Sequence, residues 1–290
     1  MKERKQEAPH INIERSIIKE FRRGIWRPFV RGLQDYEMIK AGDRIAVCIS
    51  GGKDSMLMAK CLQQLKRQSE TKFDLEFIVM DPGYHPDNRS LIEKNAALMN
   101  IPIRIFDSDI FDIVVDVDQS PCYLCARMRR GYLYDHAKQL GCNKIALGHH
   151  FDDVVETILM GILYGGQINT MMPKLHSTNF EGMELIRPLY YVKEEDILAW
   201  KDHNHLHFLQ CACRFTEQTA RELEARGIKE DAADVIHTSK RQEMKELIAS
   251  LRKVSPFIDS NIMKSVENIN LDACIGYVKD GVRHHFMEEY

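Results

Sequence analysis

The sequence predicts an α/β fold: a doubly wound parallel sheet with helical extensions at both ends of the chain. Short apolar runs typical of buried parallel strands alternate with helix-period segments, and charged helix-period stretches lie at either end. We therefore expect an N-terminal helical arm over residues 1–40, a central domain over 41–214 and a C-terminal helical extension over 215–290.

Each element of the central domain follows from its local pattern. The expected strands are Arg44–Ile49, Leu75–Met80, Ile103–Phe106, Lys144–Leu147 and Leu185–Pro188. The expected helices are Ser55–Arg67, Arg89–Met99, Cys125–Gln139, Asp152–Tyr164 and Lys193–Asn204, followed in the C-terminal extension by Thr216–Arg226 and Ser239–Lys253. Beyond Arg214 we see no strand signal.

The N-terminal arm has an amphipathic helical pattern over Ile11–Met38, which Gly24 and Pro28 should break or kink. Basic residues recur at every fourth position of the arm: Arg15, Lys19, Arg23, Arg27 and Arg31. This stripe is either a solvated helix face or a surface that contacts phosphates.

Bulk composition limits the class of protein. With 290 residues, 44% of them hydrophobic and 29% charged, the chain can bury a full core. No apolar run approaches the roughly 18 residues of a membrane span, and the N-terminus leads into no apolar signal core, so we expect a cytoplasmic protein without a membrane partner. The net charge of −3 means that any RNA binding requires a local basic patch.

A phosphate site is predicted after the first strand. The segment consists of Ser50, Gly51, Gly52, Lys53, Asp54 and Ser55 and leads directly into a helix. Two glycines allow close approach of the backbone to an anion, and the helix start offers free N–H groups. The common P-loop is excluded, because Val47 and Asp54 stand where that motif needs Gly and Ser or Thr.

This segment resembles the loop of the PP-loop ATP pyrophosphatases, whose fold is that of the adenine nucleotide alpha hydrolases. The resemblance implies ATP binding, adenylation of an oxygen and release of pyrophosphate. It also implies that the segment ending in Asp81 lies along the adenosine, where Asp81 either bonds the ribose or caps a turn.

A second motif follows the fourth strand: Gly148, His149, His150, Phe151, Asp152 and Asp153. Adjacent aspartates repel each other unless a cation lies nearby, so Mg²⁺ on a polyphosphate is one interpretation. The other is that Asp152 or Asp153 caps a helix, and both can hold together. With Lys174 and Arg187 further on, the motif resembles the branch that contains the lysidine and 2-thiocytidine synthetases. Either basic residue would face phosphates or flank a strand as a surface charge.

Eight cysteines in a reducing compartment are better interpreted as metal ligands, thiols or core residues than as disulfides. Cys122 and Cys125 precede a helix, and Cys211 and Cys213 follow a strand-like segment over His207–Gln210. Their spacing fits both a structural zinc site and an iron–sulfur cluster. Cys48, Cys61, Cys142 and Cys274 are interpreted as packing residues.

The chain resembles the 2-thiocytidine synthetases through most of its length. That resemblance implies a [4Fe-4S] cluster on Cys122, Cys125 and Cys211, with one iron not bound by protein. Cys213 is a rival for the third position, because this chain has Cys-x-Cys where the family usually has Cys-x-x-Cys. Arg127, Arg129 and Arg130, which follow Cys125, are placed to bind phosphate of ATP or tRNA.

The resemblance implies ATP-dependent thiolation of tRNA at cytidine 32. Lys53, Asp152 and Asp153 would be catalytic, and the phosphate loop, Asp81, Gly148 and His149 would bind ATP with Mg²⁺. A sulfur donor such as a cysteine desulfurase would be a partner, and a homodimer is an option. Three alternatives stay open: a lysidine-type ligase, a uridine-directed thiolase, and a zinc-stabilised nucleotide-binding protein without catalysis.

Overall fold

The computed structural model describes residues 8–108, 121–209 and 240–288, with the backbone alone for 121–127. Internal contacts divide the chain into two compact units. The first contains residues 1–153 and 172–238, and the second contains residues 154–171 and 239–290.

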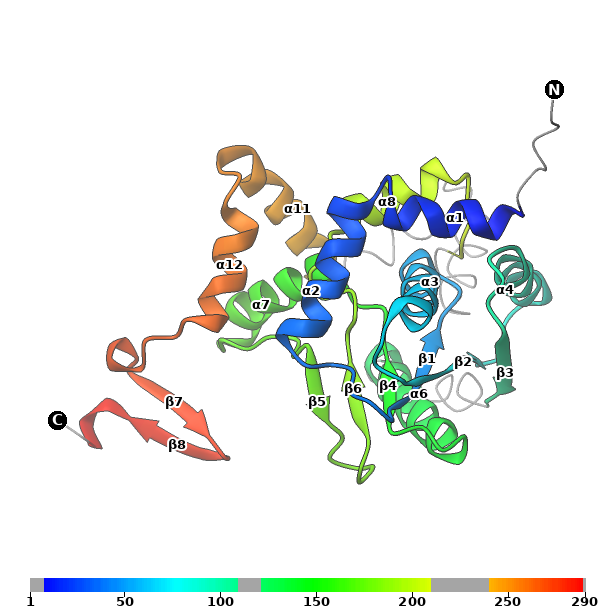
Figure 1. Cartoon of the computed structure of the whole chain (residues 1–290). Coiled ribbons are helices and arrows are strands. Elements are labelled where there is room, and N and C mark those ends of the chain that lie inside the picture. Colours follow the sequence, from blue (N-terminus) through cyan, green and yellow to red (C-terminus); the bar gives the residue numbers. More distant parts are fainter. Residues whose placement is uncertain (1–7, 109–120, 210–239, 289–290) are drawn as a thin grey trace, which may run out of the picture. The chain divides into compact units, whose positions relative to one another are not determined.

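The first unit is built on a six-stranded sheet with the order β3-β2-β1-β4-β6-β5 (Figure 1). Its strands are β1 (Arg44–Ile49), β2 (Asp74–Asp81), β3 (Ile103–Asp107), β4 (Lys144–Ala146), β5 (Lys174–His176) and β6 (Glu184–Ile186). The five predicted strands are confirmed, and all pair in parallel. Strand β5 pairs antiparallel with β6 and was not predicted, because its three residues at the sheet edge are mostly exposed and form no apolar run.

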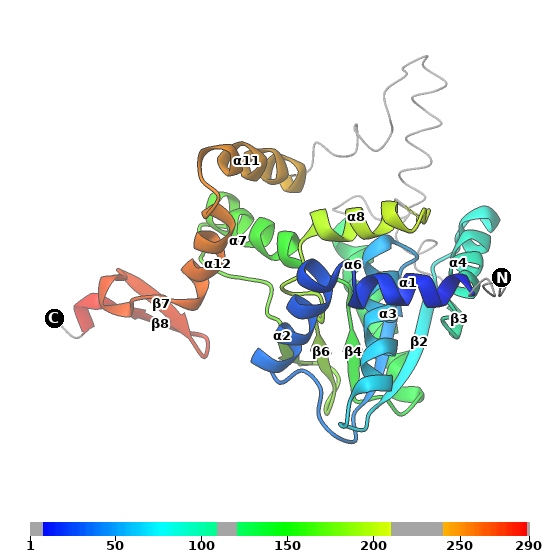
Figure 2. The same cartoon turned by 45° about the horizontal axis from the view of Figure 1, so that its top comes forward.

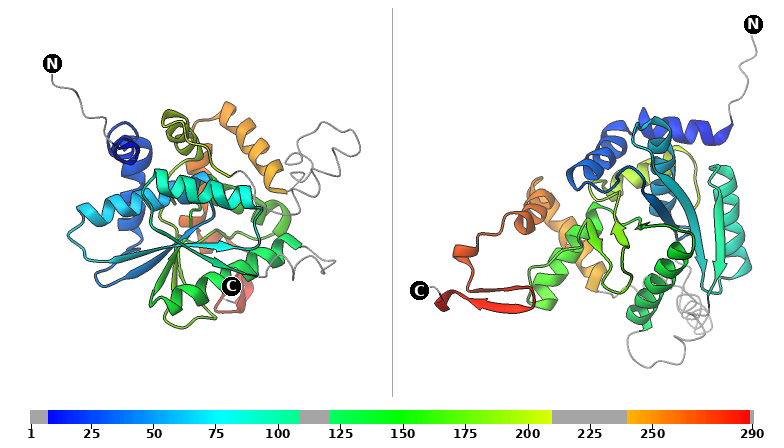
Figure 3. Two further views of the ribbon diagram at one scale, coloured as in Figure 1. Left: turned by 90° about the vertical axis from the view of Figure 1, so that its right-hand side faces the viewer. Right: turned by 60° about the horizontal axis from the view of Figure 1, so that its bottom comes forward.

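Helices cover both faces of this sheet. They are α3 (Lys53–Gln68), α4 (Pro86–Leu98), α6 (Pro121–Gln139) and α8 (Glu194–His203). Helix α7 (Phe151–Gly165) begins in this unit and continues into the second unit. In Figure 3 the green helix α6 lies on one side of the sheet and the blue and cyan helices lie on the other. Alternate residues of β1 serve the two faces: Ala46 and Cys48 pack with Tyr134 and Ala137 of α6. The predicted helices of the central domain are confirmed.

The N-terminal arm forms α1 (Pro9–Ile18), a π-helical turn η1 (Arg22–Trp26) and α2 (Arg27–Asp35) (Figure 2). The arm is interrupted as expected, but α1 already ends at Ile18; Gly24 lies within the π turn, and Pro28 lies in the first turn of α2. Three apolar side chains of the arm are fully buried and pack it against the sheet domain: Ile17, Ile25 and Phe29.

Two expectations about strands are wrong. No strand forms over His207–Leu209; Leu209 donates a hydrogen bond to the Gly51 carbonyl at 3.3 Å in place of a ladder. The second unit contains a hairpin of β7 (Gly276–Lys279) and β8 (Val282–His285), although no strand was expected beyond Arg214. Asp280 and Gly281 both have positive φ, as a two-residue type I′ turn requires, and this Asp-Gly pair is the sequence signal of the hairpin.

The second unit also contains α11 (Lys240–Val254), α12 (Ile258–Glu267), and the short 3₁₀ turns η2 (Leu271–Ala273) and η3 (Phe286–Glu288). The predicted helix Ser239–Lys253 is confirmed as α11, whereas Thr216–Arg226 lies outside the described residues. The buried carboxylate of Glu156 on α7 forms ion pairs with Arg241 and Lys245, which attach α11 to α7.

Candidate active site

A cavity of about 350 Å³ opens at the carboxyl ends of β1 and β4. These strands are neighbours, yet the chain leaves β1 toward β2 and β3 and returns to the opposite side at β4, which makes this crevice the switch point of the sheet. The cavity is lined by Cys48, Ile49, Ser50, Asp54, Ser55, Met80, Tyr84, Arg129, Arg130, Leu133, Leu147, Gly148, His149 and Asp153. The fold thus brings both predicted motifs to one site.

The phosphate loop has a backbone that only glycine permits at one position. Gly51 has φ +85°, and a Cβ there would lie 2.6 Å from Cγ1 of Ile92. Gly52 is the N-cap of α3 and has no side chain to cap the helix. The N–H groups of the first turn therefore make no capping bond to this residue and can donate to a ligand. Together with the helix dipole, these donors favour an anion.

Two serine hydroxyls hold the loop in shape. Ser55 donates through Oγ to the Gly52 carbonyl at 2.9 Å and accepts the Ser50 N–H at 3.2 Å. The two hydroxyl oxygens are 3.2 Å apart. Both serines therefore face the cavity from a loop that is already closed on itself, and a bound phosphate would not need to organise it.

Gly148 joins the two motifs. An added Cβ would lie 3.0 Å from the Ser55 nitrogen and 3.1 Å from its Cα, which are backbone atoms of the first turn of α3. Only a residue without a side chain lets the end of β4 approach the start of α3 this closely. Gly148 was predicted to bind ATP. Its close packing explains how it can contribute, because it brings His149 beside the phosphate loop.

His149 is held by Arg187. The Arg187 Nε donates to Nδ1 of His149 at 3.3 Å, and its Nη1 donates to the Met172 carbonyl. An arginine cannot accept a hydrogen bond, so Nδ1 of His149 carries no proton and Nε2 is the protonated nitrogen. Burial, followed by repulsion from Arg130, lowers the pKa of Arg187 to about 10. Lys174 lies elsewhere, with its ammonium on the Glu37 carbonyl at 3.0 Å.

The two aspartates of the second motif act as helix caps. Asp153 accepts the N–H of His150 at 3.0 Å, which is the return bond of a capping box at the start of α7. Asp152 accepts the N–H of Glu194 at 2.7 Å and so caps α8. The capping interpretation is confirmed for both. Asp153 also lines the cavity, so its capping bond does not remove it from the site.

Asp54 has one carboxylate oxygen that accepts no hydrogen bond in the described part of the chain. Its Oδ1 is buried and lies 3.3 Å from the Lys53 ammonium, but it has no hydrogen-bond partner among the residues that the structure describes. Burial raises its pKa, against the opposing effects of Lys53 and His150. A carboxylate that lines a phosphate-binding cavity in this state can bind a cation.

Lys53 does not line the cavity. Its ammonium contacts Glu194 at 3.0 Å and Asp54 at 3.3 Å. Burial would lower the pKa of Lys53, but these two carboxylates together raise it. Glu194, which sequence reasoning missed, therefore ties α8 to the phosphate loop. The acidic start of α8 was visible in the sequence, but no local pattern indicates this tertiary contact.

Asp81 occupies the turn after β2. Its Oδ1 accepts the N–H groups of Gly83 and Tyr84 at 2.8 and 2.7 Å, and its Oδ2 pairs with Arg89 at 3.0 Å. Of the two predicted roles, the structure contains the turn cap. Tyr84, held by this turn, reaches the wall of the cavity.

The predicted metal ligands lie at the limits of what the structure describes. Cys122 and Cys125 belong to the first turns of α6, in the part described by backbone alone, and Cys211 and Cys213 lie outside the described residues. Within those residues, no three His, Cys, Asp or Glu side chains gather as a metal site.

Three of the four cysteines expected to pack are buried. Cys48, Cys61 and Cys142 are buried, and burial raises the pKa of all three thiols, that of Cys142 to about 11. Cys48 borders the cavity, but at neutral pH its thiol remains protonated and is a poor nucleophile. Cys274 is partly exposed.

Comparison with known proteins places this geometry in a family. A model described as "PP-loop domain" matches residues 27–223. The tRNA-cytidine(32) 2-sulfurtransferase of Geotalea uraniireducens is 34% identical over 243 residues, 82% of this chain and 88% of that protein. The protein of the same name from Coxiella burnetii is 35% identical over 242 residues, 82% of this chain and 87% of that protein.

The chain belongs to the PP-loop family, among the tRNA-cytidine(32) 2-sulfurtransferases. A solved structure of the U34-tRNA thiolase NcsA from Methanococcus maripaludis, with its [4Fe-4S] cluster, is similar in fold. Its TM-score is 0.62 at 20% identity, over 89% of this chain and 81% of that one. The matched residues include the predicted phosphate loop at Ser50–Ser55. Among the helices of the described residues, none is long and apolar enough to span a membrane.

Proposed function

We propose that this protein uses ATP to replace the 2-oxygen of cytidine 32 in tRNA with sulfur. The relatives at 34–35% identity carry that activity in their names. The observation in the structure that supports it most directly is the convergence of the phosphate loop, the His149 motif and two arginines of α6 on one cavity. Both predicted cysteine pairs lie within a few residues, along the sequence, of residues at or next to this cavity.

The first chemical step is adenylation. The cytosine oxygen attacks the α phosphorus of ATP, the bond to the β phosphate breaks, and pyrophosphate leaves. In this proposal the N–H groups of α3 with Ser50 and Ser55 hold the departing phosphates, and Nε2–H of His149 donates to the charge that develops in the transition state. Arg129 and Arg130 of α6 supply positive charge to the lining of the cavity.

Mg²⁺ fits two carboxylates of the cavity. Asp54 offers a buried oxygen whose near neighbour is the Lys53 ammonium at 3.3 Å, and Asp153 lines the same cavity. Mg²⁺ typically binds through one or two carboxylates together with substrate phosphates, so a site of this size would be completed by ATP. Asp152, whose carboxylate caps α8, would act on this site indirectly.

The cysteines would hold a [4Fe-4S] cluster beside the cavity. Arg129 and Leu133 of α6 line the cavity, and positions 122, 125, 129 and 133 share one helix face by their spacing. The third proposed ligand closely follows, in sequence, a residue that contacts the phosphate loop. The Leu209 N–H donates a hydrogen bond to the Gly51 carbonyl, and Cys211 follows Leu209 by two residues. We assign the ligands as Cys122, Cys125 and Cys211, with Cys213 as the rival third ligand.

When bound on these cysteines, such a cluster would supply sulfide, the nucleophile that replaces AMP on the adenylated base. A sulfur donor such as a cysteine desulfurase would deliver sulfur as a persulfide, and a two-electron reductant is then needed to release that sulfur as sulfide. The zinc alternative keeps the same thiolates in a closed tetrahedron, which leaves no position for sulfide.

Anaerobic purification followed by iron, sulfide and zinc analysis, with pyrophosphate release and nucleoside analysis of the tRNA, tests the proposal. We expect about four irons per chain, tRNA-dependent pyrophosphate release and thiolation at cytidine 32. Cys122→Ala should remove the cluster absorbance, whereas Cys142→Ala, a buried thiol away from the ligand set, should retain it. A metal-free protein that modifies tRNA would indicate the lysidine-type alternative, thiolated uridine would indicate the uridine-directed one, and one zinc without pyrophosphate release would indicate the non-catalytic one.

A further inference from the structure

The N-terminal arm carries positive charge that the cavity does not use. Lys19, Arg22, Arg23 and Arg27 are exposed, and Glu20 is the one acidic residue among them in sequence. None of the four basic residues forms an ion pair within the part of the chain that the structure describes. The neighbouring charges are paired: Arg31 with Asp35, Lys40 with Glu37, and Glu14 with Lys60 and Arg67 of α3.

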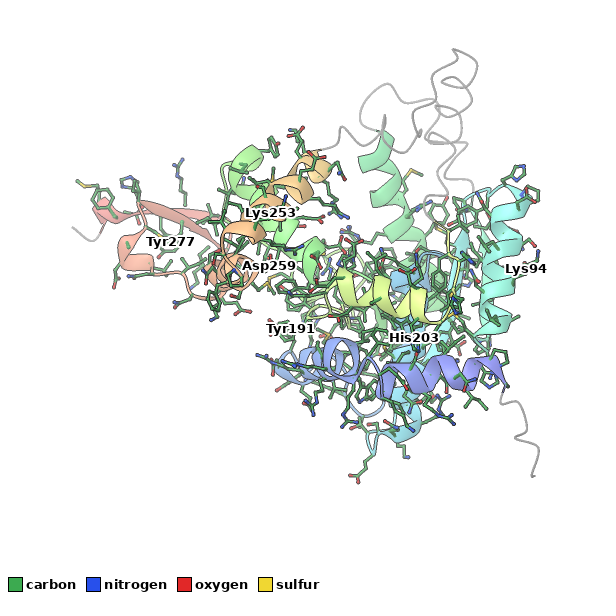
Figure 4. All side chains as sticks on the ribbon, turned by 90° about the horizontal axis from the view of Figure 1, so that it is seen from above. Lys94, Tyr191, His203, Lys253, Asp259 and Tyr277 are labelled. Carbon is green, nitrogen blue, oxygen red and sulfur yellow. The ribbon has the colours of Figure 1, made fainter. Side chains whose placement is uncertain are left out.

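The fold holds this arm in a fixed position. Ile17, Ile25 and Phe29 are fully buried, and the ring of Phe21 packs edge-on against His203 at the end of α8, at 5.5 Å between ring centres. Figure 4 shows His203 on α8 alongside the arm. Apolar side chains thus anchor one side of the arm, and the basic side chains remain in solvent.

The arm packs on the helix that contacts the phosphate loop. Gly24, between Arg23 and Ile25, packs so tightly on α8 that an added Cβ would lie 2.1 Å from Oδ1 of Asp196. Two residues earlier on α8, Glu194 contacts Lys53 at 3.0 Å. The arm and the first turn of α3 therefore both contact the first turn of α8.

We propose that Lys19, Arg22, Arg23 and Arg27 bind backbone phosphates of the tRNA substrate and orient it toward the cavity. This role presupposes the tRNA activity proposed above. Charge complementarity favours a nucleic acid: the whole chain has a net charge of −3, so attraction for a polyanion has to come from a local surface such as this one. Arginine also matches phosphate geometry with paired N–H groups.

Salt-dependent tRNA binding tests this role. The triple variant Arg22→Gln, Arg23→Gln, Arg27→Gln should weaken binding on the order of tenfold or more at physiological salt, and should reduce the slope of log K against log salt by about 2–3, since each phosphate contact contributes about 0.7–0.9. The turnover number at saturating tRNA should stay unchanged, while KM for tRNA rises. The matched control is Lys94→Gln, Lys138→Gln, Lys279→Gln, three exposed lysines on α4, α6 and β7.

A second triple variant, with lysine at the same three arm positions, keeps the charge and should restore most of the slope. The proposal is overturned if the glutamine variant binds tRNA with the wild-type slope, or if the control loses as much. It is also overturned if tRNA binding is unchanged but sulfur transfer from a protein donor falls, because the surface would then serve that protein. Failure of the wild-type protein to thiolate tRNA would instead reject the proposed function.

Discussion

Replacing Arg187 separates the geometry of the site from the stability of the fold. This guanidinium is 5% exposed and donates to both His149 and the Met172 carbonyl. Its pKa is lowered to about 10, chiefly by burial. Such a shift from the ordinary arginine value means that the folded protein disfavours the charge by about 3 kcal/mol.

Arg187→Met removes the buried charge together with its two hydrogen bonds. Each bond from a charged donor contributes about 1.5–3 kcal/mol, and relief of the buried charge returns about 3 kcal/mol, so the two effects largely cancel. We expect the free energy of unfolding to change by less than about 2 kcal/mol. Urea unfolding at pH 7 measures it.

Activity should respond much more strongly than stability. Without Arg187, His149 loses the bond that fixes its ring and its protonated nitrogen, and misplacement of such a group by about 1 Å can reduce the rate about 100-fold. Pyrophosphate release with tRNA should fall by about that factor in kcat/KM, and Arg187→Lys, which supplies one donor group in place of a fork, should lie between wild type and Met. A methionine variant that unfolds, or one with full activity, would refute this reasoning.

Three further substitutions test other contacts. Lys53→Ala should lower the melting temperature by a few degrees, about 1 kcal/mol, through loss of the Glu194 pair; an unchanged KM for ATP would mean that Lys53 does not contact phosphate, whereas a large increase would support its predicted catalytic role. Gly148→Ala should cost about 1–3 kcal/mol in urea unfolding and weaken ATP binding in calorimetry, because its Cβ meets backbone of α3. Asp43→Asn should cost roughly 2–3 kcal/mol at pH 7, because the carboxylate accepts from Asn143 and Lys144.

The Asp43 effect should depend on pH in a defined direction. Burial opposes ionisation of Asp43, but its hydrogen bonds to Asn143, the Lys40 N–H and Lys144 leave its pKa below the ordinary value of 3.8. The carboxylate therefore contributes its full stability above about pH 4, and this contribution is lost as pH falls through the lowered folded pKa. The difference between wild type and Asp43→Asn should be constant from pH 7 to 5 and shrink below pH 4; a difference that grows on acidification would contradict the assignment.

The local sequence pattern was sufficient to predict the helices and strands that bury apolar residues. Strand β1 and helix α3 follow directly from an apolar run and a helical period, and the parallel arrangement follows from their alternation. Elements with little burial were missed: β5 is largely exposed, and the β7–β8 hairpin exposes nearly all its residues and depends on its Asp280-Gly281 turn. A turn signal that would have revealed the hairpin was present in the sequence.

For the site, motifs located the residues but not their partners. Ser50, Ser55, Gly148 and His149 meet at the cavity as expected, because the carboxyl ends of β1 and β4 are adjacent. The contact between Lys53 and Glu194 joins residues 141 positions apart and has no signature in either segment. Long-range ion pairs of this kind depend on how helices pack, which local periodicity does not encode.

The two interpretations of the acidic pair after β4, helix capping and cation binding, are compatible, as the sequence had allowed. Asp153 caps α7 through one carboxylate bond and still borders the cavity, while Asp152 caps α8 and so positions Glu194 beside Lys53. A helix that begins at the carboxyl end of a strand needs an acceptor at its first turn, and a phosphate-binding cavity at the same place can use carboxylates for a cation. Both needs arise at one edge of the sheet, so one aspartate pair can satisfy them without conflict.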